Sequence, residues 1–422
     1  MKTAHVSLFR ATVGLALGLF IATVACSDSE TPSAPDGVQQ QDGGGDGGAD
    51  QRVKPPASIS FTLDKKVTVA QPPGAHLAFP SVVRRADGKL LVAYRQGKGH
   101  VEATGRIMGQ VGSADGLTWK PAEVLLDTAD VDDRDPSLAV LASGDVALTY
   151  FQYKTASVAG STLILHHIFY CRSQDQGASF GSCVQVDEGV MDAPGATIDA
   201  SSKLWVDGQG EPIAVMASSS PVVQVGTRLV LASYGGKTLN LGTLASAPRS
   251  RITLYESADE GKTWTPRPVN HDADKTVWQQ EPAILPLGGD DWLMQIRTSV
   301  QASPGGAGYL AQARSSDGGK TWSAFQNLDF IGHAPDLYRL KNGALLSAYR
   351  GLNASYSAAS TAFVASVDGG KTWSAPIVVA ECGNKECGYP SLLELADDKL
   401  LVVYYGAGGA AIEAAVYSFS TP

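Results

Sequence analysis

A short phrase built around aspartate, glycine and an aromatic residue recurs along the chain, four times at full length and once shortened. The copies are Ser113-Ala-Asp-Gly-Leu-Thr-Trp119, Ser173-Gln-Asp-Gln-Gly-Ala-Ser-Phe180, Ser257-Ala-Asp-Glu-Gly-Lys-Thr-Trp264, Ser315-Ser-Asp-Gly-Gly-Lys-Thr-Trp322 and Ser366-Val-Asp-Gly-Gly-Lys-Thr-Trp373. In a β-hairpin turn of this kind, Asp accepts backbone N–H bonds, Gly supplies a positive φ and the aromatic ring packs beneath. Recurrence at intervals of 60, 84, 58 and 51 residues predicts a repeated sheet unit, so the chain is interpreted as an array.

A second template marks the hairpins of this array. A Pro opens one strand, a polar turn follows, and a second strand ends fifteen residues after the Pro. The template spans residues 80–95, 136–151, 282–297, 335–350 and 390–405, with a degenerate copy at 201–216. Alternating apolar runs in these segments predict strands. With residues 58–69 as a closing strand, residues 57–422 are predicted to form an all-β fold, a six-bladed β-propeller of four-stranded antiparallel blades.

The topology of these hairpins gathers polar and aromatic side chains at one end of the array. In an antiparallel hairpin, the start of the first strand and the end of the second lie on the same side. These positions hold Phe79, Asp135, Glu281, Ala334, Tyr389 and, in the degenerate copy, Asp199, and at the other strand ends Arg95, Phe151 with Gln152, Arg297, Arg350 and Tyr405. One mouth is therefore predicted to collect three arginines, two or three carboxylates and two tyrosines. The alternative is that polar strand ends only keep this mouth soluble.

These motifs resemble those of one known family. The repeated phrase is similar to the Asp-box, or BNR repeat, of sialidases and other β-propellers, where it lies on outer turns and is usually structural. Glu281-Pro282, followed by Arg297, resembles the sialidase segment whose Glu polarises a tyrosine nucleophile and whose Arg helps to grip the substrate carboxylate. Gly388-Tyr389-Pro-Ser-Leu resembles the segment that bears this tyrosine. The resemblance covers about residues 70–420 and implies that Tyr389 is the nucleophile.

Two positions depart from the sialidase pattern. The first arginine of the family's carboxylate triad corresponds to Ala78, and the loop that should carry the acid/base aspartate has no Asp. Asp135 and Glu102 are the carboxylates that could supply the acid, and His100 is a further candidate for proton transfer. The predicted site consists of Tyr389, Glu281 and Asp135 as catalytic residues, with Arg95, Arg134, Arg297, Arg350, His100 and Glu102 as substrate contacts.

The favoured hypothesis is a surface-anchored, sialidase-like exo-glycosidase that acts on an anionic or unusual glycan. A neutral tyrosine avoids repulsion from an anionic sugar, provided that a carboxylate removes its proton, and glycoside cleavage also needs an acid. One alternative is a propeller that binds glycan or protein without turnover, its site having decayed at Ala78. Another is a purely structural propeller. Glu281 would then be a strand-end carboxylate paired with Arg297, and Tyr389 a packing residue.

The N-terminus carries export features. Lys2 and Arg10 precede an apolar run over residues 11–25, which predicts a signal peptide over residues 1–26. The ending Ala22-Thr-Val-Ala-Cys26 resembles a bacterial lipobox, with Thr where Leu is usual, and implies a lipid on Cys26. Residues 27–56 are predicted to be a disordered tether, because its first part is acidic and rich in glycine. The protein is therefore expected in the cell envelope, in the outer membrane, held by its lipid alone.

Charge and cysteine content limit the partners. Of the net charge of −9, residues 1–26 contribute +2 and residues 27–50 contribute −6, which leaves −5 without a basic run. Nucleic acid is therefore not an expected partner. Beyond Cys26, the cysteines form two close pairs, which predict the disulfides Cys171–Cys183 and Cys382–Cys387 in an exported chain. No cofactor or metal is expected, and the chain is expected to be a monomer.

Overall fold

The computed structural model contains β-strands and one short 3₁₀ helix, η1 (Ala407–Gly409), as its regular structure in the part it describes. That part comprises residues 53–102, 104–158, 161–187, 197–198, 205–206, 215–236, 251–269, 277–300, 308–353, 358–383, 386–395 and 398–421. The predicted signal peptide, Cys26, Asp199 and most of the tether lie outside these residues. An all-β fold is confirmed. No helix among the described residues is both long and apolar enough to cross a membrane.

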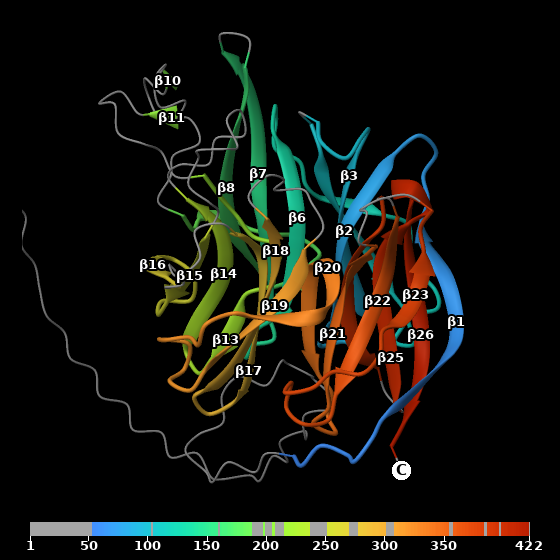
Figure 1. Cartoon of the computed structure of the whole chain (residues 1–422). Coiled ribbons are helices and arrows are strands. Elements are labelled where there is room, and N and C mark those ends of the chain that lie inside the picture. Colours follow the sequence, from blue (N-terminus) through green and yellow to red (C-terminus); the bar gives the residue numbers. More distant parts are fainter. Residues whose placement is uncertain are drawn as a thin grey trace, which may run out of the picture. The chain divides into compact units, whose positions relative to one another are not determined.

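Two sheets of the described residues consist of four strands that follow one another along the chain, and Figure 1 shows the sheets arranged side by side. The first sheet contains β2 (His76–Arg84), β3 (Leu90–Gly97), β4 (Arg106–Gly112) and β5 (Glu123–Leu126). The second contains β6 (Asp132–Val140), β7 (Val146–Val158), β8 (Ser161–Ser173) and β9 (Val184–Gln185). The third contains β12 (Val215–Ala217), β14 (Arg228–Gly236), β15 (Arg251–Ser257) and β16 (Thr265–Pro268), with β13 (Val223–Val225) also paired to β14. A separate pair is formed by β10 (Thr197–Ile198) and β11 (Trp205–Val206).

One long strand links two of the remaining sheets. The N-terminal part of β20 (Gln326–Arg339) pairs with β19, and its C-terminal part pairs with β21. On one side lie β17 (Val277–Gly288), β18 (Asp291–Val300) and β19 (Tyr309–Ser315). On the other side lie β21 (Leu345–Leu352), β22 (Ala359–Ser366) and β23 (Ile377–Glu381). The last sheet contains β24 (Gly388–Leu395), β25 (Lys399–Gly406), β26 (Ala411–Ser420) and β1 (Ser60–Ala70).

The N-terminal strand completes the last sheet, as predicted for residues 58–69. β1 runs antiparallel to β26, with Phe61 opposite Phe419. The Phe61 ring also packs edge-on against Phe363, with 5.0 Å between ring centroids. This pairing joins the two ends of the repeated region and leaves β26 without an open edge.

Each sheet contacts the sheets next to it, mainly through its first or second strand. β2 contacts both β6 and β24, β20 contacts both β17 and β24, β17 contacts β14, and β12 contacts β7 and β8. The apolar core lies between the sheets, as where Leu77 and Tyr94 of one sheet pack with Leu401 and Tyr405 of the next. This arrangement is consistent with a propeller. The count of six blades stays a prediction, because the hairpin expected at 201–216 lies mostly outside the described residues.

The five regular hairpins of the sequence template are confirmed. Each first strand pairs antiparallel with the strand that follows it, as β2 with β3, β6 with β7, β17 with β18, β20 with β21 and β24 with β25.

The repeated Asp phrase forms the expected turn. In one copy, Asp259 Oδ1 accepts from the backbone N–H of Thr263 at 2.9 Å and Asp259 Oδ2 accepts from the Thr263 hydroxyl at 2.6 Å. Gly261 has a φ of 88°, and its carbonyl accepts from the indole N–H of Trp264 at 3.0 Å. The turn is held by bonds among residues at most seven positions apart, so it can form wherever the phrase occurs.

Both predicted disulfides are present. Cys171 on β8 is bonded to Cys183 across one Asp turn, and Cys382 is bonded to Cys387 between β23 and β24. Each therefore closes a short loop at the end of a strand.

Candidate functional site

Each of the five regular hairpins begins with a strained residue in a β-bulge. Phe79, Asp135, Glu281, Ala334 and Tyr389 directly precede the template prolines, and their φ values lie between 48° and 57°. The strand register shifts at every one of these positions. A positive φ costs a residue with a side chain about 1–2 kcal/mol, and bulges re-aim side chains beside functional sites. The same strained backbone at five equivalent positions gives all five residues the same local orientation.

Four of these five residues line one cavity. Phe79, Asp135, Ala334 and Tyr389 surround a space of about 1080 Å³, open solvent included. Deeper in the strands the lining continues with Asp336 and with a set of small hydroxyl residues, Ser81, Ser137, Ser219 and Ser391. The hairpin starts therefore converge on one cavity, as their topology requires.

Glu281 is the centre of the hydrogen bonding at this cavity. Its Oε1 accepts from the Tyr389 hydroxyl at 2.7 Å and from Arg297 Nη1 at 2.7 Å. Its Oε2 accepts from the backbone N–H of Ala334 at 2.8 Å. Glu281 is 4% exposed, so these charge-assisted bonds act in a medium of low polarity. The carboxylate is fixed in place and in direct contact with the tyrosine oxygen.

The environment keeps the Tyr389 hydroxyl protonated. Burial raises the pKa of Tyr389 well above its ordinary value, and the negative charge of Glu281 raises it further. Arg297 and Arg350 oppose this shift but do not reverse it. The Tyr389 ring packs edge-on against Phe79, with 4.8 Å between centroids. The Tyr389 hydroxyl is therefore neutral, and it is oriented because it donates its proton in a hydrogen bond to the Glu281 carboxylate.

Asp135 lines the cavity directly, as Asp336 does deeper in it. Burial raises its pKa to about 7, with the nearby charge of Glu281 acting in the same direction and Arg134 against it. Within the described residues, Asp135 Oδ1 has no hydrogen-bond partner, and Arg134 Nε lies 4.0 Å away. A carboxyl group with this pKa can donate a proton and take it back near neutral pH.

Arg134 is held behind the cavity wall. Its Nη1 donates to Asp132 Oδ2 at 2.9 Å and to the His100 carbonyl at 2.6 Å. Its guanidinium also lies over the Phe79 ring, 5.0 Å from the centroid. Arg134 is 5% exposed, so it supplies positive charge to the cavity mainly through space.

Arg95 does not open onto the cavity, contrary to the prediction from topology. Its Nε and Nη2 bind the two oxygens of Asp132 at 2.6 and 2.9 Å, and the side chain is fully buried. Gly105 makes room for this pair, because a Cβ there would lie 1.8 Å from Asp132 Oδ1. Glu102 also faces inward on this loop, where Oε1 accepts from the backbone N–H of Lys98 at 2.7 Å. Arg95, which the topology predicted to bind substrate, is thus bound to Asp132 instead.

Arg297 and Arg350 lie on the second strands of their hairpins, as predicted, but like Arg95 and Glu281 they are not among the described residues that line the cavity. Arg297 is 9% exposed and contacts Glu281, whereas Arg350 is 5% exposed. Burial raises the pKa of Tyr389 and of Tyr405, and the positive charge of Arg350 opposes the shift at both phenols. The two arginines therefore bring positive charge to this side of the site, which Glu281 offsets in part.

His100, a predicted candidate for proton transfer, contacts Glu386. Its Nδ1 lies 2.9 Å from Glu386 Oε2, and burial lowers the pKa of His100 despite this contact. His76 Nε2 lies 3.1 Å from the same oxygen. Neither His76 nor Glu386 carried any signal in the sequence.

Tyr234 is a further residue that the sequence analysis missed. Burial raises the pKa of Tyr234 well above its ordinary value, with Glu281 and Asp135 adding to the shift. It lies on β14, in the sheet whose hairpin template is degenerate, so no template proline marked it. Asp132, by contrast, lies two residues before Arg134, so the sequence already suggested that its carboxylate could pair with an arginine.

Comparison with known proteins agrees with this fold. The model of the BNR repeat-like domain matches residues 136–402. A protein of unknown function from Dyadobacter fermentans has a TM-score of 0.69 at 21% identity, covering 85% of this chain and 99% of that one. No curated protein sequence matches significantly.

Two enzymes of known structure share the fold at lower identity. The leech intramolecular trans-sialidase complexed with 2,7-anhydro-Neu5Ac has a TM-score of 0.55 at 12% identity, covering 86% of this chain and 70% of that one. The Penicillium chrysogenum α-L-arabinanase complexed with arabinobiose has a TM-score of 0.57 at 14% identity, covering 84% and 98% respectively. At such identities the similarity concerns the fold.

Proposed function

Since the chain belongs to the BNR repeat-like family, within the sialidase-like superfamily, we propose that it is a glycoside hydrolase with Tyr389 as nucleophile. The observation that carries the proposal is the contact between the Tyr389 hydroxyl and Glu281, which Arg297 shares. A phenol attacks poorly unless its proton leaves as the new bond forms. Glu281 is already in place to accept that proton.

The first step forms a covalent glycosyl-enzyme intermediate. Tyr389 Oη attacks the anomeric carbon while its proton moves to Glu281, and the glycosidic C–O bond breaks. Asp135 gives its proton to the departing oxygen, so that the leaving group departs as an alcohol. This role requires a protonated carboxyl group, and burial raises the pKa of Asp135 to about 7.

The second step releases the sugar. Asp135, now ionised, removes a proton from water as the water oxygen attacks the anomeric carbon. The bond to Tyr389 breaks, and Glu281 returns the proton to the phenolate. Both groups regain their starting state, and two displacements at one carbon retain its configuration.

The substrate is proposed to be an anionic glycan or another unusual one. Arg297 and Arg350 place positive charge near Tyr389, and the attacking group is neutral. A carboxylated sugar would therefore be attracted by the arginines without being repelled by the nucleophile. The hydroxyl-rich cavity lining and Phe79 suit the polar and apolar faces of a pyranose ring.

A non-catalytic binding propeller is the second candidate, and one position favours it. Ala78, which corresponds to the first arginine of the sialidase triad, is fully buried. The nearby Arg95 is bound to Asp132 and does not take over that role. A site with an incomplete carboxylate clamp could hold a glycan without driving its hydrolysis.

We also propose that the chain is a six-bladed propeller, exported and lipid-anchored through Cys26 and working as a monomer. The order of sheet contacts supports the propeller. Two disulfides support an oxidising compartment outside the cytoplasm. Mass spectrometry of the mature chain should find an acylated Cys26 as its first residue. A mature N-terminus elsewhere would contradict the anchor.

The test of function measures turnover and binding on the same protein. The purified full chain is assayed on a panel of chromogenic glycosides and on a glycan array, beside Tyr389→Phe as the matched variant. This variant keeps the ring on Phe79 and loses only the hydroxyl. Hydrolysis by the wild type and not by Tyr389→Phe is expected. Binding by both proteins without turnover would establish the second candidate, and neither binding nor turnover would contradict both.

A further inference from the structure

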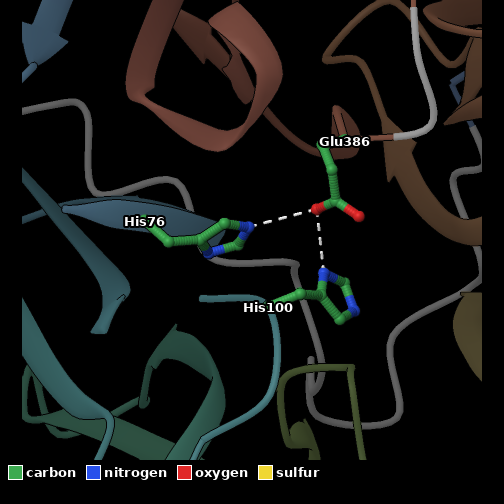
Figure 2. Close-up of side chains that lie close together, drawn as sticks. All are labelled: His76, His100 and Glu386. Carbon is green, nitrogen blue, oxygen red and sulfur yellow. Dashed lines mark hydrogen bonds and ion pairs between the residues drawn. The ribbon is translucent and has the colours of Figure 1, made fainter. Parts of the chain in front are cut away.

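Three side chains that are distant in the sequence meet beside the candidate site. Figure 2 shows the Glu386 carboxylate between the rings of His76 and His100. Glu386 Oε2 lies 3.1 Å from His76 Nε2 and 2.9 Å from His100 Nδ1, and the three atoms lie within 4.8 Å of one another. The side chains are 10%, 38% and 34% exposed for His76, His100 and Glu386, so the cluster is supported by the fold on one side and open to solvent on the other.

Each of the three residues is positioned by structure outside the cluster. His76 belongs to β2, and its ring lies against Gly409, where a Cβ would come within 2.6 Å of Nε2. The backbone of His100 is held by Arg134, which donates to the His100 carbonyl. Glu386 directly precedes Cys387, which is bonded to Cys382. Contacts outside the cluster therefore hold the three side chains close together.

We propose that His76, His100 and Glu386 bind a divalent transition-metal ion, with zinc as the expected ion. Two imidazoles and one carboxylate are a ligand set that zinc takes in sites with a fourth, open position. The Glu386 carboxylate brings negative charge to the cluster, which attracts a cation. The nearby Arg134 opposes this attraction in part.

The three ligand atoms must rearrange to accept the ion. Tetrahedral zinc bonds of about 2.1 Å hold ligand atoms about 3.4 Å apart. The two N–O distances of 2.9 and 3.1 Å are a few tenths of an ångström shorter than this. The three atoms spread over as much as 4.8 Å, so the partly exposed His100 side chain would also have to bring its Nδ1 closer to His76 Nε2, by about 1.4 Å. The fourth ligand would be water or a substrate oxygen on the exposed side.

The ion would lie next to the cavity of Tyr389. The His100 ring is 5.6 Å from the Phe79 ring, and Phe79 in turn packs on Tyr389. His76 lies two residues before Ala78 on the same strand. The metal would therefore bring positive charge to the side of the site where the sialidase pattern has an arginine and this chain has alanine. The binding of the ion itself does not rest on the proposed hydrolase function.

Metal content and affinity test the proposal directly. The full chain, freed of any affinity tag, is titrated with zinc chloride by calorimetry after chelator treatment and dialysis. One ion per chain is expected, and elemental analysis of untreated protein should find it. His76→Gln, His100→Gln and Glu386→Gln should each lower the affinity by on the order of 10²-fold. Glu381→Gln is the matched control, an exposed glutamate beside the same disulfide, and should not change it.

A spectroscopic measurement covers variants that fail to fold. Cobalt added to the wild-type chain should give visible d–d absorption of a four- or five-coordinate site, which zinc then removes. A wild type that binds zinc no more tightly than the His76→Gln/His100→Gln double variant, or that shows no such cobalt spectrum, would overturn the proposal. In that case the cluster is a carboxylate hydrogen-bonded to two histidines. Zinc binding without any glycoside turnover would instead leave this site standing and remove the proposed hydrolase.

Discussion

At the scale of single residues, the site depends on how one carboxylate distributes its hydrogen bonds. Glu281 holds the Tyr389 hydroxyl and Arg297 on the same oxygen, while its other oxygen binds the backbone of Ala334. Arg297 anchors the carboxylate, so the oxygen that should receive the phenolic proton cannot turn away. Glu281 and Tyr389 therefore form one functional unit, which a double-mutant comparison can reveal.

The first prediction concerns this unit. Tyr389→Phe should lower kcat/KM by about 10³-fold or more, because it removes the attacking oxygen. Glu281→Gln added to it should cost little more, because a base without a nucleophile has no proton to accept. Steady-state kinetics of the two single variants and the double variant check this. Full additivity of the two losses would show that the residues act separately.

The second prediction concerns pH. Asp135 has a pKa raised to about 7 by burial, so its acidic form is lost as pH rises through 7. We expect kcat/KM to fall about tenfold per pH unit above that value, and Asp135→Asn to abolish this dependence together with most of the activity. An unchanged alkaline limb in Asp135→Asn would assign the titration to another group.

Stability should respond to the same group in a defined direction. The folded-state pKa of Asp135 lies above the unfolded value of 3.8, so burying the ionised form destabilises the protein increasingly as pH rises from about 4 to 7. Asp135→Asn should therefore stabilise the chain at pH 8 relative to wild type and change it less at pH 4.

At the scale of elements, the Asp turn and the bulged hairpin have different tasks. The turn satisfies its own polar groups, as the Asp259 carboxylate does with Thr263 and Ser257. The bulge does the opposite, because it places residues such as Glu281 and Tyr389 in strained backbone to present them to the cavity. The Asp turn stabilises the sheets, whereas the bulge lowers stability locally because it holds the site residues in strained backbone.

The third prediction concerns the Asp turn. Hydrogen bonds from the Thr263 hydroxyl and backbone, then from the Ser257 hydroxyl, lower the pKa of Asp259 to about 2. A lowered pKa stabilises the fold above the unfolded value of about 3.8 and loses that effect as pH falls toward 2. Asp259→Ala should therefore lower Tm at pH 7 by a few degrees, and the difference should shrink between pH 4 and pH 2. Thermal unfolding checks this, with the exposed Asp329→Ala as control.

At the scale of the whole molecule, the first strand of the repeated region completes the last sheet. β1 pairs with β26 over most of its length, although the two lie at opposite ends of the chain. Neighbouring sheets share apolar surface, so a sheet without its fourth strand would leave more of that surface exposed. The stability of the array therefore depends on one long-range pairing.

The fourth prediction tests that pairing. Phe61→Ala removes ring packing on Phe363 and Phe419 and should lower the free energy of unfolding by about 1–3 kcal/mol. Leu63→Ala, at an exposed position of the same strand, should change it by less than about 0.5 kcal/mol. Urea unfolding measures both. Equal losses in the two variants would mean that β1 is held by its backbone bonds alone.

The sequence by itself determined the elements, because their causes are local. An Asp turn closes within seven residues and a hairpin within fifteen, so their patterns are visible in short windows of sequence. The prolines that open the hairpins also marked Asp135, Glu281 and Tyr389, because strand direction fixes which ends share a side. Even the closing strand followed from counting strands in each unit.

Only the tertiary structure decided which partner each charged side chain takes. Arg95 was assigned to the cavity from its strand position, but Asp132, on the neighbouring sheet, binds it first. His76 and Glu386 lie 310 residues apart and meet only where the last sheet packs on the first. Periodicity reports which face a residue lies on, whereas an ion pair depends on distances between sheets, which no local pattern encodes.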